Sequence, residues 1–143
     1  MRDVAVRIAR EGHTLGNHTW SHARPHAIER ADFVAEIART DALLADVARL
    51  AGVTLAQPIP VRLPYGAVEN DPRLAWLAAL GRTHTGWTAD FGDFRPDTDA
   101  RDLADRMRRH VDKLRDAVLD LHDTSRELAA RDATVEAVRL FLS

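Results

Sequence analysis

Two histidines four residues apart are the first candidates for chemistry in this chain. His18 and His22 are separated by Thr-Trp-Ser, and imidazole is the protein ligand most often found on zinc-like metals. On a helix, this spacing would place both rings on one face. Gly12 and Gly16 before the pair and Pro25 after it favour a loop instead, in which the rings can also converge. A histidine-rich surface loop without a metal is the alternative interpretation.

Length and composition exclude several classes of protein. A chain of 143 residues is long enough for one domain with a substantial core, so we expect a single domain over residues 1–143. The formal net charge of −2 argues against a nucleic-acid partner. No apolar run reaches the roughly 18 residues of a membrane span, and the charged start does not resemble a secretory signal. The absence of cysteine excludes disulfides, thiolate ligands and cysteine nucleophiles.

The hydrophobic pattern predicts helices that alternate with short strands. Helical periodicity extends over residues 2–11, 28–51, 71–80, 99–115 and 126–142. Strands are expected at residues 13–17, 61–63, 83–88 and 117–121. This order favours an α/β fold with a parallel sheet and crossover helices.

Candidate site residues follow each of the four predicted strands. They are His18 and His22, Tyr65 and Gly66, Asp90 and Asp93, and His122 and Asp123. Folds of the α/β class carry their sites at the carboxyl ends of strands. We therefore expect residues from all four strand ends to face one cleft.

Taken together, these segments resemble the NodB-type polysaccharide deacetylases, the family-four carbohydrate esterases, in order and in spacing. Residues 18–22 resemble the second motif of that family, His-Ser/Thr-x-x-His, and residues 62–66, Arg-Leu-Pro-Tyr-Gly, resemble its third, Arg-x-Pro-Tyr. Residues 90–94, Asp-Phe-Gly-Asp-Phe, resemble the fourth motif, Asp-x-x-Asp-Trp, and residues 121–123, Leu-His-Asp, resemble the fifth. The resemblance covers nearly the whole chain and implies a partial, deformed (β/α) barrel with a parallel sheet.

The chain also departs from the family pattern. The family begins with a strand that ends in Thr-Phe-Asp-Asp-Gly, where one aspartate is the general base and the other is the third metal ligand. No Asp-Asp pair occurs in this chain, and the chain also ends before the final strand of the family, so we expect a domain that is incomplete, truncated at both ends. Phe94 stands where tryptophan is usual. Asp120 stands where a leucine usually lines the acetyl-methyl pocket, although an extra residue near Asp120 would also explain that difference.

The resemblance implies metal-assisted hydrolysis of an N-acetyl amide. His18 and His22 would bind a divalent metal, with zinc as the first candidate and cobalt or nickel as alternatives. His122 would be the general acid that protonates the leaving amine, and Asp93 would hold and tune it.

The third motif and the aromatic residues would complete the site. Arg62 would orient the missing aspartate base, and the Tyr65 backbone N–H would bind the oxyanion. The substrate-binding residues that the resemblance implies are Pro64, Gly66, Trp87, Phe94 and Leu121.

Two functions from different classes remain open at this point. The first is a hydrolase that removes N-acetyl or O-acetyl groups from an acetylated polysaccharide, such as chitin oligomers or peptidoglycan, with the present stretch inactive alone. The second is a noncatalytic remnant that binds sugar or metal, which the absent base aspartate favours. Hydrolysis of cyclic imides or ureides on the same superfold is a further alternative. Members of the family are often secreted or found at the cell envelope, while the sequence leaves localisation and oligomeric state open.

Overall fold

The computed structural model describes residues 2–123 and 132–143, which belong to two compact units. The first unit spans Met1–Gly86 and the second spans Trp87–Ser143. Most of the regular secondary structure that is described in both units is helical, and the rest consists of short parallel pairings. The fold is therefore mostly helical with a small parallel sheet, and the partial, deformed (β/α) barrel stays a prediction.

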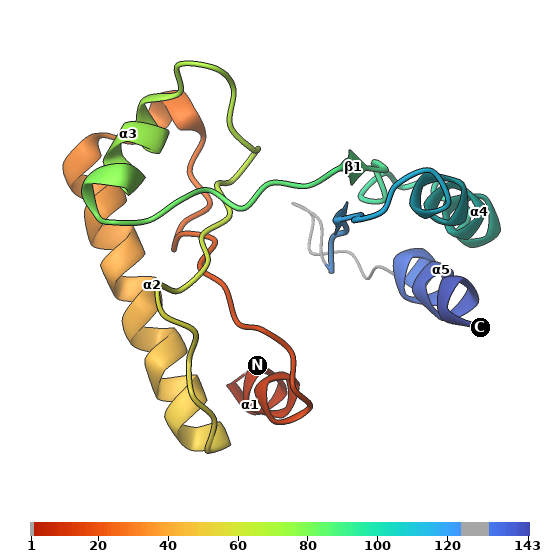
Figure 1. Cartoon of the computed structure of the whole chain (residues 1–143), viewed down its shortest axis with the longest axis horizontal. Helices are drawn as coiled ribbons and strands as arrows, with labels where there is room; N and C mark the ends of the chain where they lie inside the picture. Colours follow the sequence, from red (N-terminus) through yellow and green to blue (C-terminus); the bar gives the residue numbers. More distant parts are fainter. Residues whose placement is uncertain (1, 124–131) are drawn as a thin grey trace. The chain divides into compact units, whose positions relative to one another are not determined.

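Three α-helices and a short 3₁₀ helix form the first unit (Figure 1). They are α1 (Arg2–Arg10), η1 (Pro25–Ala27), α2 (Arg30–Ala51) and α3 (Pro72–Ala79). A glycine caps the C-terminus of α2, because Gly52 has a φ of 71° and donates its N–H to carbonyls of the last turn. At the start of α3, the Asp71 side chain accepts the backbone N–H of Arg73, and Pro72 occupies the first turn.

The apolar stripe of α2 organises two cores in this unit. Figure 1 shows α1 and α3 near opposite ends of α2. One cluster joins α2 and α3 to the segment between them and contains Phe33, Ile37, Val61, Leu63 and Leu77. The other joins α1 to the end of α2 and contains Val6, Ala9 and Val47. Burial of these side chains fixes the helix on which the loop of residues 18–22 rests.

The strands predicted for the first unit are reduced to single parallel bridges. Asn17 pairs with Val61, and Val61 pairs with His84. The predicted parallel order is confirmed, but the lengths were wrong for 13–17, 61–63 and 83–88, since no longer strand occurs among the described residues of this unit. Proline flanks the central bridge at Pro60 and Pro64, and a residue without an N–H cannot extend a ladder.

The second unit places two helices beside one strand pair. Its elements are β1 (Ala89–Asp90), α4 (Ala100–Val111), β2 (Leu119–Asp120) and α5 (Asp132–Leu142). The two strands pair in parallel, Ala89 with Leu119. Figure 1 shows α4 and α5 side by side, and their shared core contains Leu103, Ala104, Met107 and Ala137. The predicted helix over 126–142 is confirmed from Asp132 onward, and its first part lies outside the described residues.

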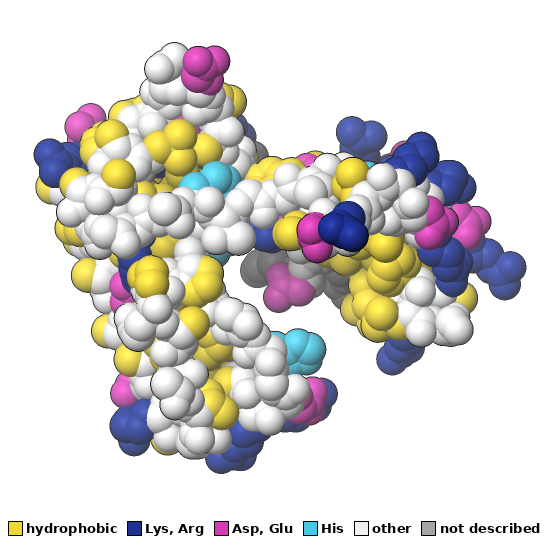
Figure 2. Space-filling model, in the orientation of Figure 1, with side chains coloured by type: hydrophobic (Ala, Val, Ile, Leu, Met, Phe, Trp, Pro, Cys, Tyr) yellow, Lys and Arg dark blue, Asp and Glu magenta, His cyan; other side chains and the backbone are white. Residues whose placement is uncertain are grey.

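The surface agrees with the nearly balanced charge. In Figure 2, acidic and basic side chains are interspersed on the visible face of each unit, without a broad basic area. Among the helices that the structure describes, none is both long and apolar enough to cross a lipid bilayer.

Candidate active site

His18 and His22 contact each other in a loop, as predicted. We call them the histidine pair, and residues 18–22 the histidine loop. Their ring centroids are 4.9 Å apart in an edge-to-face arrangement, and the ring of His22 lies 4.8 Å from that of Tyr65. The Nδ1 of His18 is 2.8 Å from the carbonyl oxygen of Arg62. A carbonyl only accepts, so Nδ1 donates, and Nε2 is the unprotonated nitrogen of neutral His18. Metal-binding histidines are typically tied in this way.

The histidine pair fits two of the ligands of a zinc-like metal. Catalytic zinc sites commonly use three protein ligands and leave a further position for water or substrate. In the described part of the chain, no three histidine, aspartate or glutamate side chains come together in a group that could hold a metal. The donor chemistry therefore fits two ligands of a metal site, and a third ligand from an Asp-Asp motif, which the resemblance implies, stays a prediction.

The backbone of the histidine loop is strained and is anchored by Asn17. Thr19 and His22 have φ angles of 61° and 56°, in the left-handed region that side chains disfavour. Asn17 is fully buried and donates from Nδ2 to the Ile37 carbonyl at 2.9 Å and to Asp41 at 2.7 Å. Its Oδ1 accepts the N–H of Thr19 at 2.9 Å. The loop thus begins at a residue fixed to α2.

A carboxylate on α2 binds the middle of the histidine loop. Glu36 accepts the backbone N–H groups of Trp20 and Ser21, each at 3.2 Å, and the hydroxyl of Ser21. Burial raises the pKa of Glu36, but the hydrogen bonds from Ser21 and Trp20 together outweigh it and hold that pKa below its usual value. One turn further along α2, the guanidinium of Arg39 lies 3.6 Å from the centre of the Trp20 ring, a cation–π contact.

The turn of the third motif is held by a buried arginine. Arg73 is 2% exposed and donates to the carbonyls of Pro64 at 2.9 Å and Gly66 at 2.7 Å. It also pairs with Asp71 at 2.6 Å, and its hydrogen bonds hold the pKa of Asp71 below the ordinary range. Tyr65, at the centre of this turn, has a φ of 63°. Sequence reasoning missed Arg73, and the available signal was an arginine in the first turn of an apolar helix.

Arg62 and His84 stabilise the same part of the first unit. The guanidinium of Arg62 donates to the carbonyls of Thr85 and Gly86, each at 3.2 Å. The Leu63 N–H donates to Nδ1 of His84 at 3.2 Å. Burial and, after it, the positive charge of Arg62 lower the pKa of His84 below its usual value. His84 is therefore disposed to be a neutral hydrogen-bond acceptor in the fold.

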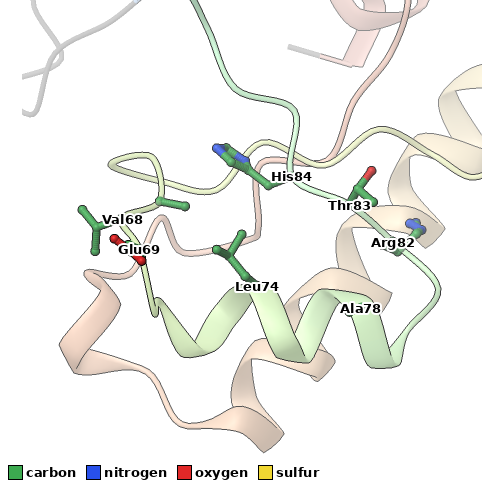
Figure 3. Close-up of a pocket in the computed structure, with 8 residues that line it drawn as sticks. Val68, Glu69, Leu74, Ala78, Arg82, Thr83 and His84 are labelled. Carbon is green, nitrogen blue, oxygen red and sulfur yellow. The ribbon is translucent and has the colours of Figure 1, made fainter.

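A hollow of about 480 Å³ lies beside α3 in the first unit. Figure 3 shows Leu74 rising from α3 toward the space bordered by Val68 and His84. Of the described residues, those that line it are Ala67, Val68, Glu69, Leu74, Ala78, Arg82, Thr83 and His84. The lining includes none of the residues predicted for the site, so this hollow is separate from the histidine pair.

In the second unit, a buried aspartate holds His122. Asp93 is 1% exposed, and its Oδ1 accepts the ring Nδ1–H of His122 at 2.8 Å. Its Oδ2 accepts the backbone N–H of His122 at 2.8 Å and the hydroxyl of Thr134 at 3.0 Å. The ring of Phe94 meets the imidazole edge to face with centroids 5.1 Å apart, and Asp120 lies 4.0 Å from Nε2. The predicted contact of Asp93 with His122 is present, while Thr134 was not foreseen.

The predicted site residues fall into two groups, one in each unit. The first unit brings together the histidine pair, Tyr65 and the backbone of Arg62, with Pro64 and Gly66 buried in the turn. The second brings together Asp93, His122 and Phe94. Leu121 packs against the core of α4 and α5, and Trp87 is half-buried. That both groups face one cleft stays a prediction.

Known proteins share both the sequence pattern and the fold. The polysaccharide deacetylase family model matches residues 1–85. The chain is 31% identical over 93 residues to a peptidoglycan-N-acetylglucosamine deacetylase of Bacillus cereus, covering 65% of this chain and 31% of that protein. It is 32% identical over 121 residues to chitin deacetylase 2 of Cryptococcus neoformans, covering 82% and 25%.

Two solved structures resemble the fold. The catalytic domain of the peptidoglycan N-acetylglucosamine deacetylase from Eubacterium rectale superposes with a TM-score of 0.75 at 16% identity, covering 99% of this chain and 64% of that one. The peptidoglycan deacetylase PdaC of Bacillus subtilis gives 0.64 at 22% identity, covering 96% and 60%. At these identities the likeness concerns the fold alone, that of a fragment of a deacetylase catalytic domain.

The family model covers more than half of the chain, so this chain belongs to the polysaccharide deacetylase family, a family of hydrolases. The resemblance inferred from the four motifs is thereby confirmed. The chain spans about a third or less of the length of the curated relatives that it matches.

Proposed function

We propose that this chain is part of a metal-dependent hydrolase that removes N-acetyl or O-acetyl groups from a polysaccharide such as chitin oligomers or peptidoglycan. The observation that carries the proposal is the hydrogen bond from Nδ1 of His18 to the Arg62 carbonyl. This hydrogen bond leaves Nε2 of His18 as the nitrogen that would bind the metal. Because the ring of His18 contacts that of His22, the two histidines would act as a pair of ligands. The sequence matches to a peptidoglycan and a chitin deacetylase support the substrate class.

The histidine pair would hold a divalent metal, with zinc first and cobalt or nickel as alternatives. Such an ion, when bound, polarises the acetyl carbonyl and lowers the pKa of a water molecule. The backbone N–H of Tyr65, in the turn held by Arg73, is the proposed donor to the oxyanion. Pro64 and Gly66 shape that turn.

His122 is the proposed general acid. Its Nδ1–H is committed to the buried Asp93, so Nε2 is the atom that delivers a proton. Once the oxygen of a water molecule has bonded to the acetyl carbon, proton delivery to the amide nitrogen lets the C–N bond break, so that acetate and a free amine are released. Trp87, Phe94 and Leu121 are the proposed walls of the sugar and acetyl pocket.

A noncatalytic remnant that binds sugar or metal is the second candidate. It is favoured by the absence of an Asp-Asp pair from the sequence and of a third ligand beside the histidine pair in the described residues. That carboxylate would be the base that takes a proton from the attacking water, so a chain without it would not be expected to catalyse the hydrolysis.

Acetate release from N-acetylglucosamine oligomers, with added zinc or cobalt, separates the two candidates. We expect little or no turnover from residues 1–143, and activity from the same chain extended at its amino terminus by a strand that ends in Asp-Asp-Gly. In the extended protein, His122→Ala should lower kcat by about 10²–10⁴ while metal binding is kept. Turnover by residues 1–143 that a chelator abolishes would overturn the role of the base. An extended protein that binds metal and oligomer without turnover would establish the remnant.

A further inference from the structure

We infer that Glu36 is a positioning residue for the histidine pair, because its carboxylate holds the backbone between the two histidines in the shape that brings their rings together. The inference rests on the proposed metal site for its functional consequence. Its structural basis is a set of hydrogen bonds from the histidine loop to α2, none of which involves a ring of the pair.

The histidine loop needs such a support because its backbone is strained. Thr19 and His22 both lie in the left-handed region, a backbone conformation that residues with a side chain disfavour. A loop released from its partners would relax toward negative φ, and a change of φ at His22 swings its ring relative to that of His18. The 4.9 Å contact of the two rings therefore depends on bonds made elsewhere in the loop.

Every backbone N–H between the two histidines has an acceptor. The N–H of Thr19 is bound by Asn17, and those of Trp20 and Ser21 are bound by one oxygen of Glu36. The other oxygen of Glu36 accepts the Ser21 hydroxyl. Hydrogen bonds to an ionised carboxylate are about twice as strong as neutral ones. Glu36 thus binds the part of the loop that Asn17 does not reach.

The helix makes Glu36 a rigid support. Ile37, the next residue, and Phe33, one turn earlier, are 3% and 1% exposed and belong to the main core of the unit. Their packing fixes the side of α2 from which Glu36 reaches the loop. A site is held in a productive geometry by residues that are themselves locked by packing.

The test compares Glu36→Gln with Asp46→Asn in cobalt and zinc titrations. Glutamine keeps one acceptor and replaces the other with an amide NH₂, which faces the donors of the loop. Asp46→Asn removes the same charge from the same helix, where Asp46 pairs with Arg2 and Arg49 and not with the loop. We expect Glu36→Gln to weaken metal affinity about tenfold or more, with an altered cobalt absorption spectrum. Equal affinities for the two variants, both folded by circular dichroism, would overturn the inference.

Ser21→Ala provides a second variant that leaves the carboxylate in place. Because Ser21 and Glu36 share the same bonds, the double variant should lose less affinity than the sum of the two single losses. If the affinity loss of the double variant equals the sum of the two single losses, Ser21 and Glu36 do not share a role.

A wild-type chain that binds neither metal would refute the proposed metal site but not the inference itself. Amide exchange of Trp20 and Ser21 then decides it. We expect faster exchange in Glu36→Gln than in Asp46→Asn by about tenfold, because the acceptor of these amides is weakened. Unchanged exchange overturns the positioning role.

Discussion

The two histidine sites of this molecule are held by carboxylates in opposite ways. In the first unit, Glu36 is only partly buried and binds the backbone beside the imidazoles. In the second, Asp93 is buried and binds the imidazole of His122 directly. The first arrangement fixes the shape of a loop and leaves a ring nitrogen of His18 to an incoming ligand. The second commits one ring nitrogen and defines which atom exchanges a proton. The two proposed roles, metal binding and proton transfer, thus call for different uses of the same functional group.

Removing the charge of the buried carboxylate should give the largest change in stability. In Asp93→Asn, an amide replaces an acceptor of three hydrogen bonds, so we expect the second unit to lose roughly 2–3 kcal/mol, against about 1 kcal/mol in the first unit for Glu36→Gln. Amide exchange in α4 and α2 reports each unit separately. If Asp93→Asn and Glu36→Gln lose the same amount of stability, the two carboxylates do not differ in the way described.

Thr134→Val is the graded version of the same experiment. It removes one of the three donors to Asp93 and should cost about 1 kcal/mol, while Thr134→Ser keeps the hydroxyl and should be nearly neutral. Asp90→Asn is a matched control, because Asp90 is exposed and accepts one bond in a local turn.

Metal should stabilise the first unit and not the second. At a zinc or cobalt concentration of about 100 times the Kd, the linkage adds about 2.7 kcal/mol to the unit that binds. We expect slower amide exchange in α2 with no change in α4, and loss of the effect in His18→Ala. If metal slows amide exchange in α4 and this protection disappears in His122→Ala, His122 is a metal ligand, which contradicts its assignment as the general acid.

Mild acid should give the smallest change in stability, again in the first unit. The pKa of His84 is lowered in the fold, first by burial and then by the charge of Arg62. In the unfolded chain, His84 therefore takes up a proton at a higher pH, near 6.5, than in the fold. The contribution of His84 to the free energy of unfolding is present above that pH and is lost as the pH falls through the pKa of His84 in the fold. His84→Asn keeps an acceptor for the Leu63 N–H but does not titrate, and it should flatten this dependence. If the stability of His84→Asn depends on pH as much as that of the unmodified chain, a group other than His84 causes the dependence.

The sequence predicts the helices and the motif residues well because both leave local signals. Helical periodicity and the glycine after α2 fix an element and its end, and the histidine spacing with nearby glycines predicts a loop. Four motifs in order were sufficient to predict the family. The strands between them were overestimated, since proline at Pro60 and Pro64 limits pairing more strongly than β-propensity favours it.

The supporting residues could not be predicted, because their roles depend on distant parts of the chain. Glu36 occupies an ordinary polar position of an amphipathic helix, and its partners lie 15 and 16 residues away. Thr134 lies 41 residues from Asp93. Arg73 is close in sequence to the turn it holds, yet a buried arginine is rare enough that periodicity assigns it to the surface.

The placement of Trp20 makes the histidine loop optically visible. Trp20 lies two residues from each histidine of the pair, is 44% exposed and has the Arg39 guanidinium over its ring. Trp76, in contrast, packs with Phe33 in the core, so the two indoles occupy different environments. Zinc has no colour and no unpaired electron, but copper or cobalt quenches indole emission at short range. Fluorescence of a variant that keeps only Trp20 would therefore report copper or cobalt binding at the proposed metal site, without a label.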